Sequence, residues 1–110
     1  MKRGDIWSAA AGSGHVGKPR PVVILQDDRF DATTSVTVCA MTTDPTDAPL
    51  IRLVIEPDDT NQLRERSRLM VDKITTVPRS KLGEGTRRLG DDDMVRLRRA
   101  TLVFLGLAGS

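Results

Sequence analysis

Residues 35–42, with the sequence SVTVCAMT, decide the fold class of this 110-residue chain. Their apolar and polar side chains alternate with a period of two, and β-branched residues are frequent, which is typical of a β-strand. The strand is expected to end at the pair Thr42 and Thr43, because the segment that follows, 44–49, is rich in proline and aspartate and suits a loop. This stretch therefore predicts a domain built mainly from β-strands.

Two further strands are predicted on the N-terminal side of this stretch. Residues 3–10, RGDIWSAA, predict the first, and a glycine-rich loop at residues 11–17 follows it. The short apolar run 22–25 lies between Pro21 and polar residues, and this pattern indicates a strand that is buried on both faces. Arg20 therefore stands where that strand begins.

More strands and a helix are predicted on the C-terminal side. Residues 50–55 predict a fourth strand, and residues 68–77 predict a fifth strand with a bend. The aspartates of residues 91–93 favour the positive end of a helix that continues to about Leu105. Five or more short strands with a terminal helix predict a compact, half-open β-barrel in one domain, residues 1–110.

The second half of the expected helix, residues 101–107, is apolar almost all round. Such a segment is either buried in the core or covered by a second copy of the chain, and a small domain has limited room for the first arrangement. We therefore expect a homodimer, and we expect Phe104 to belong to the core. The stripe of this helix that should face the core consists of Met94, Leu97, Thr101, Phe104 and Leu105.

The charge of the chain gives only a weak indication of its partner. The net charge is +2, which does not by itself predict binding to nucleic acid. Thirteen of the seventeen basic residues are arginine, whose planar guanidinium matches phosphate oxygens with two hydrogen bonds. GC-rich coding would enrich arginine equally, so both explanations stay open at this point.

The sequence predicts a protein of the cytoplasm. No apolar run is long enough for a membrane span, and the N-terminus lacks the apolar region of a signal peptide, so no contact with a membrane is expected. The single cysteine, Cys39, lies among apolar residues and is expected to be a small core residue rather than a nucleophile.

Metal and cofactor chemistry is not expected. One histidine and one cysteine stand far apart without the spacing of a metal site, and the aspartates 91–93 suit a helix start better than a metal cage. His15 has no evident orienting partner for a hydrolytic triad. The glycine fingerprints of nucleotide-binding loops are missing as well. We therefore predict no metal ion and no cofactor.

The groups that remain suit a phosphodiester substrate. Arg20, with Lys18 nearby, carries permanent charge, and Thr42 and Thr43 offer hydroxyls at a strand end. RNA needs no external nucleophile, because its 2′-hydroxyl can attack the neighbouring phosphorus when the geometry is in line and the added charge is stabilised. An arginine between prolines at a strand start is equally suited to a structural salt bridge.

Four segments, in this order and spacing, resemble the MazF/PemK family of toxins over nearly the whole chain. They are residues 2–7 (KRGDIW), 17–24 (GKPRPVVI), 41–44 (MTTD) and 68–74 (RLMVDKI). The resemblance implies an SH3-like, half-open β-barrel of the CcdB/MazF type with a C-terminal helix, and a two-fold homodimer. It also implies the toxin of a type II toxin–antitoxin system. Such a toxin cleaves single-stranded RNA at specific sequences without metal and thereby inhibits translation and growth. The cut leaves a 2′,3′-cyclic phosphate and a 5′-hydroxyl, and a cognate MazE-like antitoxin covers the RNA groove.

The resemblance also assigns site residues by position. Arg20 matches the catalytic arginine of the family and Thr42 its catalytic threonine. On physical grounds Arg20 would stabilise the pentacoordinate phosphorus, while the residue that removes the 2′-hydroxyl proton stays open. Lys73 stands where relatives often have glutamine, which leaves base specificity open. The residues expected to bind substrate are Ser13, His15, Lys18, Thr43, Asp72 and Lys73.

The loop before Arg20 departs from the pattern of the family and contains His15. The ordinary pKa of histidine, about 6.5, would suit acid–base chemistry. We favour the alternative that His15 is an exposed residue in contact with RNA or solvent. Trp7 is likewise expected to be packed in the fold rather than stacked on a base.

Two rival functions remain for a chain of this pattern. One is a toxin that resembles CcdB, which poisons a topoisomerase through its C-terminal helix and cuts no RNA. The other is an inactive regulatory or antitoxin-binding module. The combination of Arg20 with Thr42 argues against both.

Overall fold

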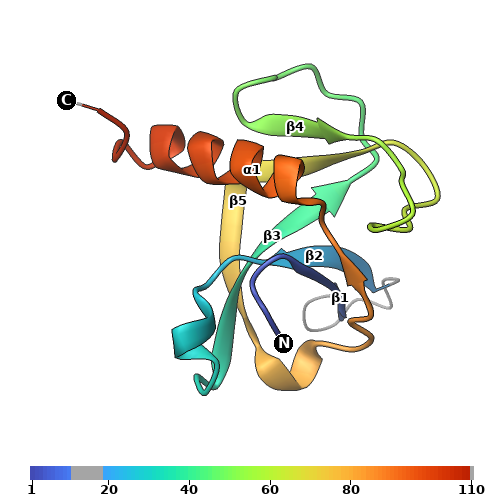
Figure 1. The fold of residues 1–110 in the computed structure, drawn as a ribbon, viewed down its shortest axis with the longest axis vertical. Coiled ribbons are helices and arrows are strands. Elements are labelled where there is room, and N and C mark those ends of the chain that lie inside the picture. Colours follow the sequence, from blue (N-terminus) through green and yellow to red (C-terminus); the bar gives the residue numbers. More distant parts are fainter. Residues whose placement is uncertain (11–18, 110) are drawn as a thin grey trace.

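One antiparallel sheet and one long helix make up the part of the chain that the structure, a computed structural model, describes, namely residues 1–10 and 19–109 (Figure 1). The strand order in the sheet is β4-β5-β3-β2-β1-β6. The elements are β1 (Asp5–Ala9), β2 (Arg20–Ile24), the 3-10 helix η1 (Asp28–Phe30), β3 (Ser35–Thr42), β4 (Arg52–Ile55), β5 (Ser67–Pro78), the 3-10 helix η2 (Arg79–Lys81), β6 (Arg87–Arg88) and α1 (Asp91–Phe104).

Strand β5 is bent, as expected, and this bend lets it pair with two strands. In its register with β3, Leu69 faces Met41 and Ile74 faces Cys39, so the residues between Leu69 and Ile74 face Ala40 alone. Such a bulge bends the strand. The first part of β5 pairs with β4 as well, and the strand curves visibly in Figure 1. The short strand β6 was not predicted from the sequence.

The strands bury side chains on both faces of the sheet. The core on the face that α1 covers, here called the helix-side core, includes Ile6, Val23, Met41, Leu69 and Leu97. The core on the opposite face, here called the outer core, consists of Ala9, Val22, Ile24, Val36 and Val38, with Trp7, Ala40, Val77, Leu82 and Met1 packed against it. Because Val22, Val23 and Ile24 are buried in turn on the two faces, the prediction of a doubly buried strand is confirmed.

Helix α1 packs against the helix-side core with the residues from Met94 to Ala100. Leu97 is fully buried, and the expected aspartates lie in the first turn of the helix. The prediction that Phe104 belongs to the core is wrong, because 47% of this residue is exposed. Figure 1 shows the C-terminal end of α1 projecting past the sheet. The exposed apolar residues at this end are Leu102, Val103, Phe104, Leu105 and Leu107.

Candidate functional site

Arg20 and Thr42, which lie far apart in sequence, lie at the same end of the adjacent strands β2 and β3. Strand pairing sets Thr42 opposite Arg68. The pairing of β2 with β3 ends at Val22 and Ala40, and Arg20 and Thr42 each lie two residues beyond that pair, at the same end of the two strands. Opposite residues on adjacent strands present their side chains on the same face, with Cβ atoms about 5 Å apart. The three residues are called the Arg20–Thr42–Arg68 row below.

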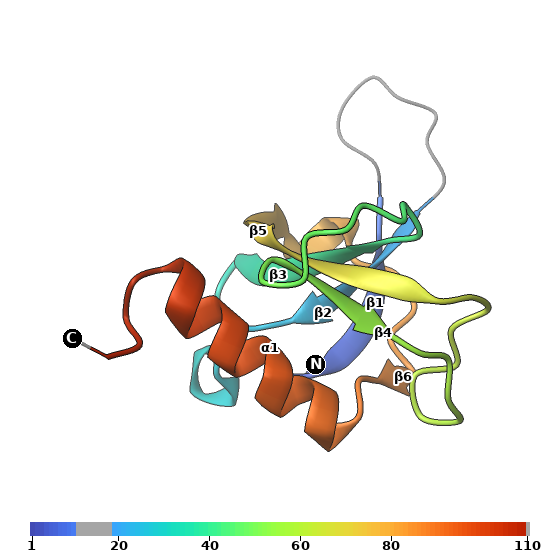
Figure 2. The ribbon, with the colours of Figure 1, turned by 90° about the horizontal axis from the view of Figure 1, so that it is seen from above.

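The row lies on the face of the sheet away from α1. Side chains alternate along a strand, so Arg20 shares a face with Val22, and Thr42 shares one with Ala40. Both Val22 and Ala40 belong to the outer core or pack against it. Figure 2 shows the beginning of β2 on the side of the molecule away from α1. Arg20 is exposed and Thr42 half-buried, so substrate can reach both.

The hydroxyl group of Thr42 is oriented by the backbone. Its Oγ1 accepts a hydrogen bond from the backbone N–H of Asp44 at 3.1 Å. The Asp44 carboxylate in turn accepts hydrogen bonds from the backbone N–H of Thr46 at 3.2 Å and from its hydroxyl at 3.0 Å. Because Oγ1 acts as an acceptor toward Asp44, the hydroxyl hydrogen of Thr42 is available to donate to a phosphate oxygen. Thr43 lies beside it and is exposed.

Asp72, in the bulge of β5, is held by an arginine that the sequence analysis did not single out. Arg52 donates from Nε and Nη2 to the two carboxylate oxygens of Asp72, at 2.8 and 3.1 Å. The side chains are 13% exposed for Arg52 and 24% for Asp72. The guanidinium of Arg52 lowers the pKa of Asp72 through these hydrogen bonds, and Asp72 raises the pKa of Arg52. With both oxygens engaged and its pKa lowered, Asp72 is a poor proton acceptor.

Arg68 is the second site residue that the sequence analysis missed. It is half-buried, and its Nη1 lies 3.5 Å from the backbone carbonyl oxygen of Asp44. Neither Arg68 nor Arg20 forms an ion pair with any residue that the structure describes. The sequence contained a signal for Arg52, an arginine inside the apolar run 50–55, but none that brought Arg68 next to Thr42.

Of the other residues predicted to bind substrate, the structure describes Lys73 but not the three residues of the loop before Arg20. Lys73 lies in the bulge beside Asp72 and is exposed. Ser13, His15 and Lys18 lie outside the described residues. Among residues 1–10 and 19–109, no group of three or more His, Cys, Asp or Glu is arranged to hold a metal ion.

Trp7 is packed, as expected, and faces the outer core. Its indole ring lies directly against the backbone of Gly85, where a Cβ atom would overlap the ring. The indole Nε1 is buried and has no hydrogen-bond partner in the described part of the chain. Trp7 therefore serves as a structural support two residues from Ala9, which pairs with Arg20.

Cys39 is fully buried in the helix-side core, which confirms that it is a core residue. Burial raises the pKa of its thiol to about 12. The thiol is therefore protonated at neutral pH, and the thiolate is the nucleophilic form. Cys39 takes no part in the candidate site.

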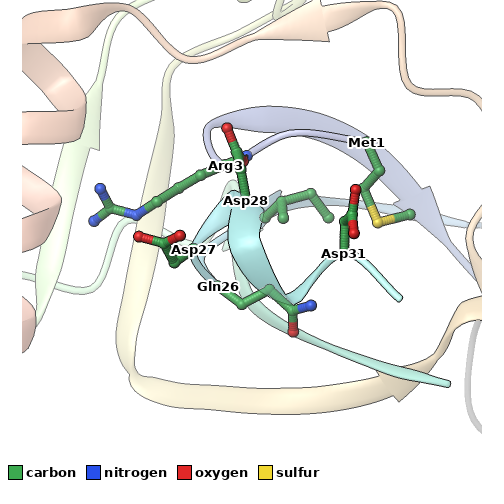
Figure 3. Close-up of a pocket in the computed structure, with 7 residues that line it drawn as sticks. Met1, Arg3, Gln26, Asp27, Asp28 and Asp31 are labelled. Carbon is green, nitrogen blue, oxygen red and sulfur yellow. The ribbon is translucent and has the colours of Figure 1, made fainter. Parts of the chain in front are cut away.

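A small pocket at the other end of β2 is too small and too acidic to be the site of a phosphodiester. It is lined by Met1, Arg3, Ile24, Gln26, Asp27, Asp28 and Asp31 (Figure 3). Its volume is about 10 Å³, enough for about one water molecule. Asp28 accepts a hydrogen bond from the backbone N–H of Arg3 at 2.7 Å, so this cluster anchors the N-terminal segment.

Comparison with known proteins relates the chain to one family of toxins. The family described as PemK-like, MazF-like toxin of type II toxin–antitoxin system matches residues 2–105. A relative from Mycolicibacterium smegmatis, named probable endoribonuclease MazF, is 61% identical over 109 residues, which cover 99% of this chain and 100% of the relative.

Solved structures share the fold. The toxin MazF-mt6 of Mycobacterium tuberculosis has a TM-score of 0.78 at 24% identity, covering 96% of this chain and 99% of its own. A mycobacterial endoribonuclease in complex with its cognate antitoxin has a TM-score of 0.78 at 21% identity, covering 100% of this chain and 99% of its own. The expected SH3-like, half-open barrel with a C-terminal helix is thereby confirmed.

Proposed function

Because this chain belongs to the PemK-like, MazF-like toxins of type II toxin–antitoxin systems, we propose that it is an endoribonuclease that cleaves single-stranded RNA at specific sequences without a metal ion. Its action would inhibit translation and growth. The observation that carries the proposal is that Arg20 and the oriented hydroxyl of Thr42 lie at the same end of the adjacent strands β2 and β3, each two residues beyond the last pair of these strands.

The proposed reaction uses the 2′-hydroxyl of the substrate as the nucleophile. This oxygen attacks the adjacent phosphorus in line and loses its proton. The bond from phosphorus to the 5′ oxygen breaks, and that oxygen gains a proton. The products are a 2′,3′-cyclic phosphate and a 5′-hydroxyl. Arg20 would stabilise the charge of the pentacoordinate phosphorus with its guanidinium, and Thr42 would donate its hydroxyl hydrogen to a phosphate oxygen.

The remaining site residues are proposed to position the RNA. Thr43 and Lys73 are exposed near the row, and Ser13, His15 and Lys18 are assigned by resemblance alone. Asp72 would act through Arg52, which its carboxylate holds in a fixed orientation. This pairing does not favour Asp72 as the proton acceptor.

Cleavage in the presence of excess EDTA is the direct test. The purified protein is expected to cut single-stranded RNA at full rate and to leave 5′-hydroxyl and 2′,3′-cyclic phosphate ends, because arginine and threonine need no metal. Sequencing of the 5′-hydroxyl ends would also define the cleavage motif. A metal-dependent nuclease in the same buffer is the control for the chelator. Absence of cyclic-phosphate ends with every RNA tested, or activity that returns only with added metal, would contradict the proposal.

Membership of this family does not favour the rival toxin that resembles CcdB and poisons a topoisomerase. The two functions differ in what they require of Arg20 and Thr42. Growth arrest on expression should disappear in Arg20→Ala and Thr42→Ala if the protein is a nuclease. It should persist in both if the C-terminal helix alone carries the toxicity.

A homodimer is proposed from the exposed apolar end of α1. This end borders a cavity of about 460 Å³ whose lining includes Leu25, Phe30, Ile74, Leu102 and Leu105. An apolar surface of this kind is stabilised when a second copy covers it. A solution mass of twice 12.0 kDa is expected at micromolar concentration, and Val103→Asp should shift it toward the monomer. A wild-type mass of one chain would contradict the dimer.

The proposal includes a cognate antitoxin of MazE type that covers the RNA groove, and action in the cytoplasm. One structural relative is described as a complex with its cognate antitoxin. In the described part of the chain, no helix is long and apolar enough to cross a membrane. A coexpressed antitoxin that bound the protein without inhibiting RNA cleavage would contradict this part of the proposal.

A further inference from the structure

The proposed reaction leaves Arg68 unused, although the residue is placed in an unusual way. A partly exposed arginine without a carboxylate partner keeps its charge available to an anionic ligand. The guanidinium of Arg68 pairs with no described carboxylate, and its contact with the Asp44 carbonyl oxygen is long, at 3.5 Å. Several of its N–H groups are therefore available to a ligand, since arginine carries five donors.

The position of Arg68 relates it to the reacting phosphate. Thr42 lies on β3, opposite Arg68 on β5, and at the same strand end as Arg20 on β2. Arg20 and Arg68 lie on strands that are separated by two strand spacings, so their backbones are about 10 Å apart across the sheet. A strand of RNA whose scissile phosphate lies between Arg20 and Thr42 would continue over Arg68 if it crosses the strands of the sheet.

The charges around Arg68 favour an anion. Asp72, on the same strand as Arg68, is neutralised by two hydrogen bonds from Arg52. Asp44 presents its backbone carbonyl to Arg68, while its carboxylate binds Thr46. The Asp44 carboxylate keeps its negative charge, because Thr46 is neutral, so the two positive charges of Arg20 and Arg68 exceed it by one beside the hydroxyl of Thr42.

We infer that Arg68 binds a phosphate of the RNA backbone adjacent to the scissile phosphate and so positions the strand over Thr42. This inference rests on the proposed nuclease function. Arg68 is a positioning residue in this role: it holds the substrate and takes no part in bond cleavage. A phosphate contact carries no base information, so Arg68 contributes affinity equally for all cleaved sequences.

The effect of Arg68→Gln on salt dependence tests the inference. Glutamine keeps a donor for the Asp44 carbonyl and removes the charge. The probe is an RNA of the mapped cut sequence, with 2′-O-methyl groups that prevent cleavage. Affinity is expected to fall about tenfold at 0.15 M salt. The slope of log affinity against log salt should become shallower by about 0.7, the value for one phosphate contact on a single strand. In cleavage assays, KM should rise about tenfold with kcat nearly unchanged.

Two further variants complete the test. Arg99→Gln removes one charge from an exposed position on α1 and should leave the salt slope and KM unchanged. Arg68→Lys keeps the charge without the planar fork, so it should keep the wild-type slope while losing about threefold in affinity. If Arg68→Gln does not fold, Arg68→Lys serves as the comparison with the wild type. A salt slope in Arg68→Lys that differs from the wild-type slope would overturn the inference.

The outcomes separate this inference from the proposed function. A wild-type protein that cuts no RNA would remove the nuclease function itself. A wild-type protein that cuts RNA, with unchanged KM and salt slope in Arg68→Gln, would overturn only the role of Arg68. Unchanged RNA binding with weakened antitoxin binding would assign the residue to the protein partner instead, and would overturn the inference as well.

Discussion

Replacing Arg20 by alanine is expected to lower the rate of RNA cleavage by about 10²–10³-fold, the usual loss when one donor to a developing oxyanion is removed. Arg20 is exposed and forms no ion pair with the described residues, so its removal should leave the fold intact. Single-turnover cleavage of one RNA measures the rate. Thermal unfolding followed by circular dichroism should give a midpoint within about 2 °C of the wild type, as for a surface substitution.

Two comparisons define what the loss means. Arg20→Lys keeps a positive charge but not the planar fork, and it should recover only part of the rate. Arg99→Ala removes the same charge from α1 and should cleave like the wild type. Cleavage by Arg20→Ala within threefold of the wild type would show that Arg20 is a structural or peripheral residue.

Replacing Gly85 by alanine is expected to destabilise the protein by about 3 kcal/mol, at the upper end for overpacking of a core. The new Cβ atom would overlap the indole ring of Trp7, so either the ring or the backbone of residue 85 must move. Trp7 packs against the outer core and has little space to shift. The midpoint of urea unfolding measures the loss. Because Trp7 is the only tryptophan, its native-state fluorescence should also change.

Gly83→Ala is the matched control for this prediction. A Cβ atom at residue 83 would lie 3.7 Å from the backbone oxygen of Ser8 and 3.8 Å from its Cβ, which is ordinary contact. The substitution should be neutral or slightly stabilising, because alanine restricts the unfolded chain more than glycine does. Equal midpoints for the two variants would show that Trp7 accommodates the methyl group and does not support the sheet in the way described.

Arg20 and Thr42 could be proposed from the sequence because local patterns place them at strand ends and the resemblance assigns roles to these positions. Arg20 follows a proline at the start of an apolar run, and Thr42 ends an alternating stretch. The period of two also determines which residues of a strand share a face. It does not determine which residue of another strand lies opposite, because that depends on register between distant segments. The contacts of Arg52 with Asp72 and the proximity of Arg68 to Thr42 were therefore beyond sequence reasoning.

The misplaced Phe104 has a related cause. Helical periodicity indicates which side of α1 faces the sheet, and Leu97 on that side is indeed buried. It does not indicate how far the sheet extends beneath the helix. The sheet ends before the last turns of α1, so the same stripe is buried at Leu97 and exposed at Phe104.

The sequence by itself determined the main strands, the helix, the burial of Cys39 and the choice of Arg20 and Thr42, because each depends on residues close together in the chain. Tertiary structure alone decided the bulge in β5, the ion pair that engages Asp72 and the exposed end of α1. It also decided that Arg68 has no carboxylate partner among residues 1–10 and 19–109. All of these depend on how segments many residues apart are aligned. The alignment is determined by the packing of the whole sheet against its two cores rather than by any one segment.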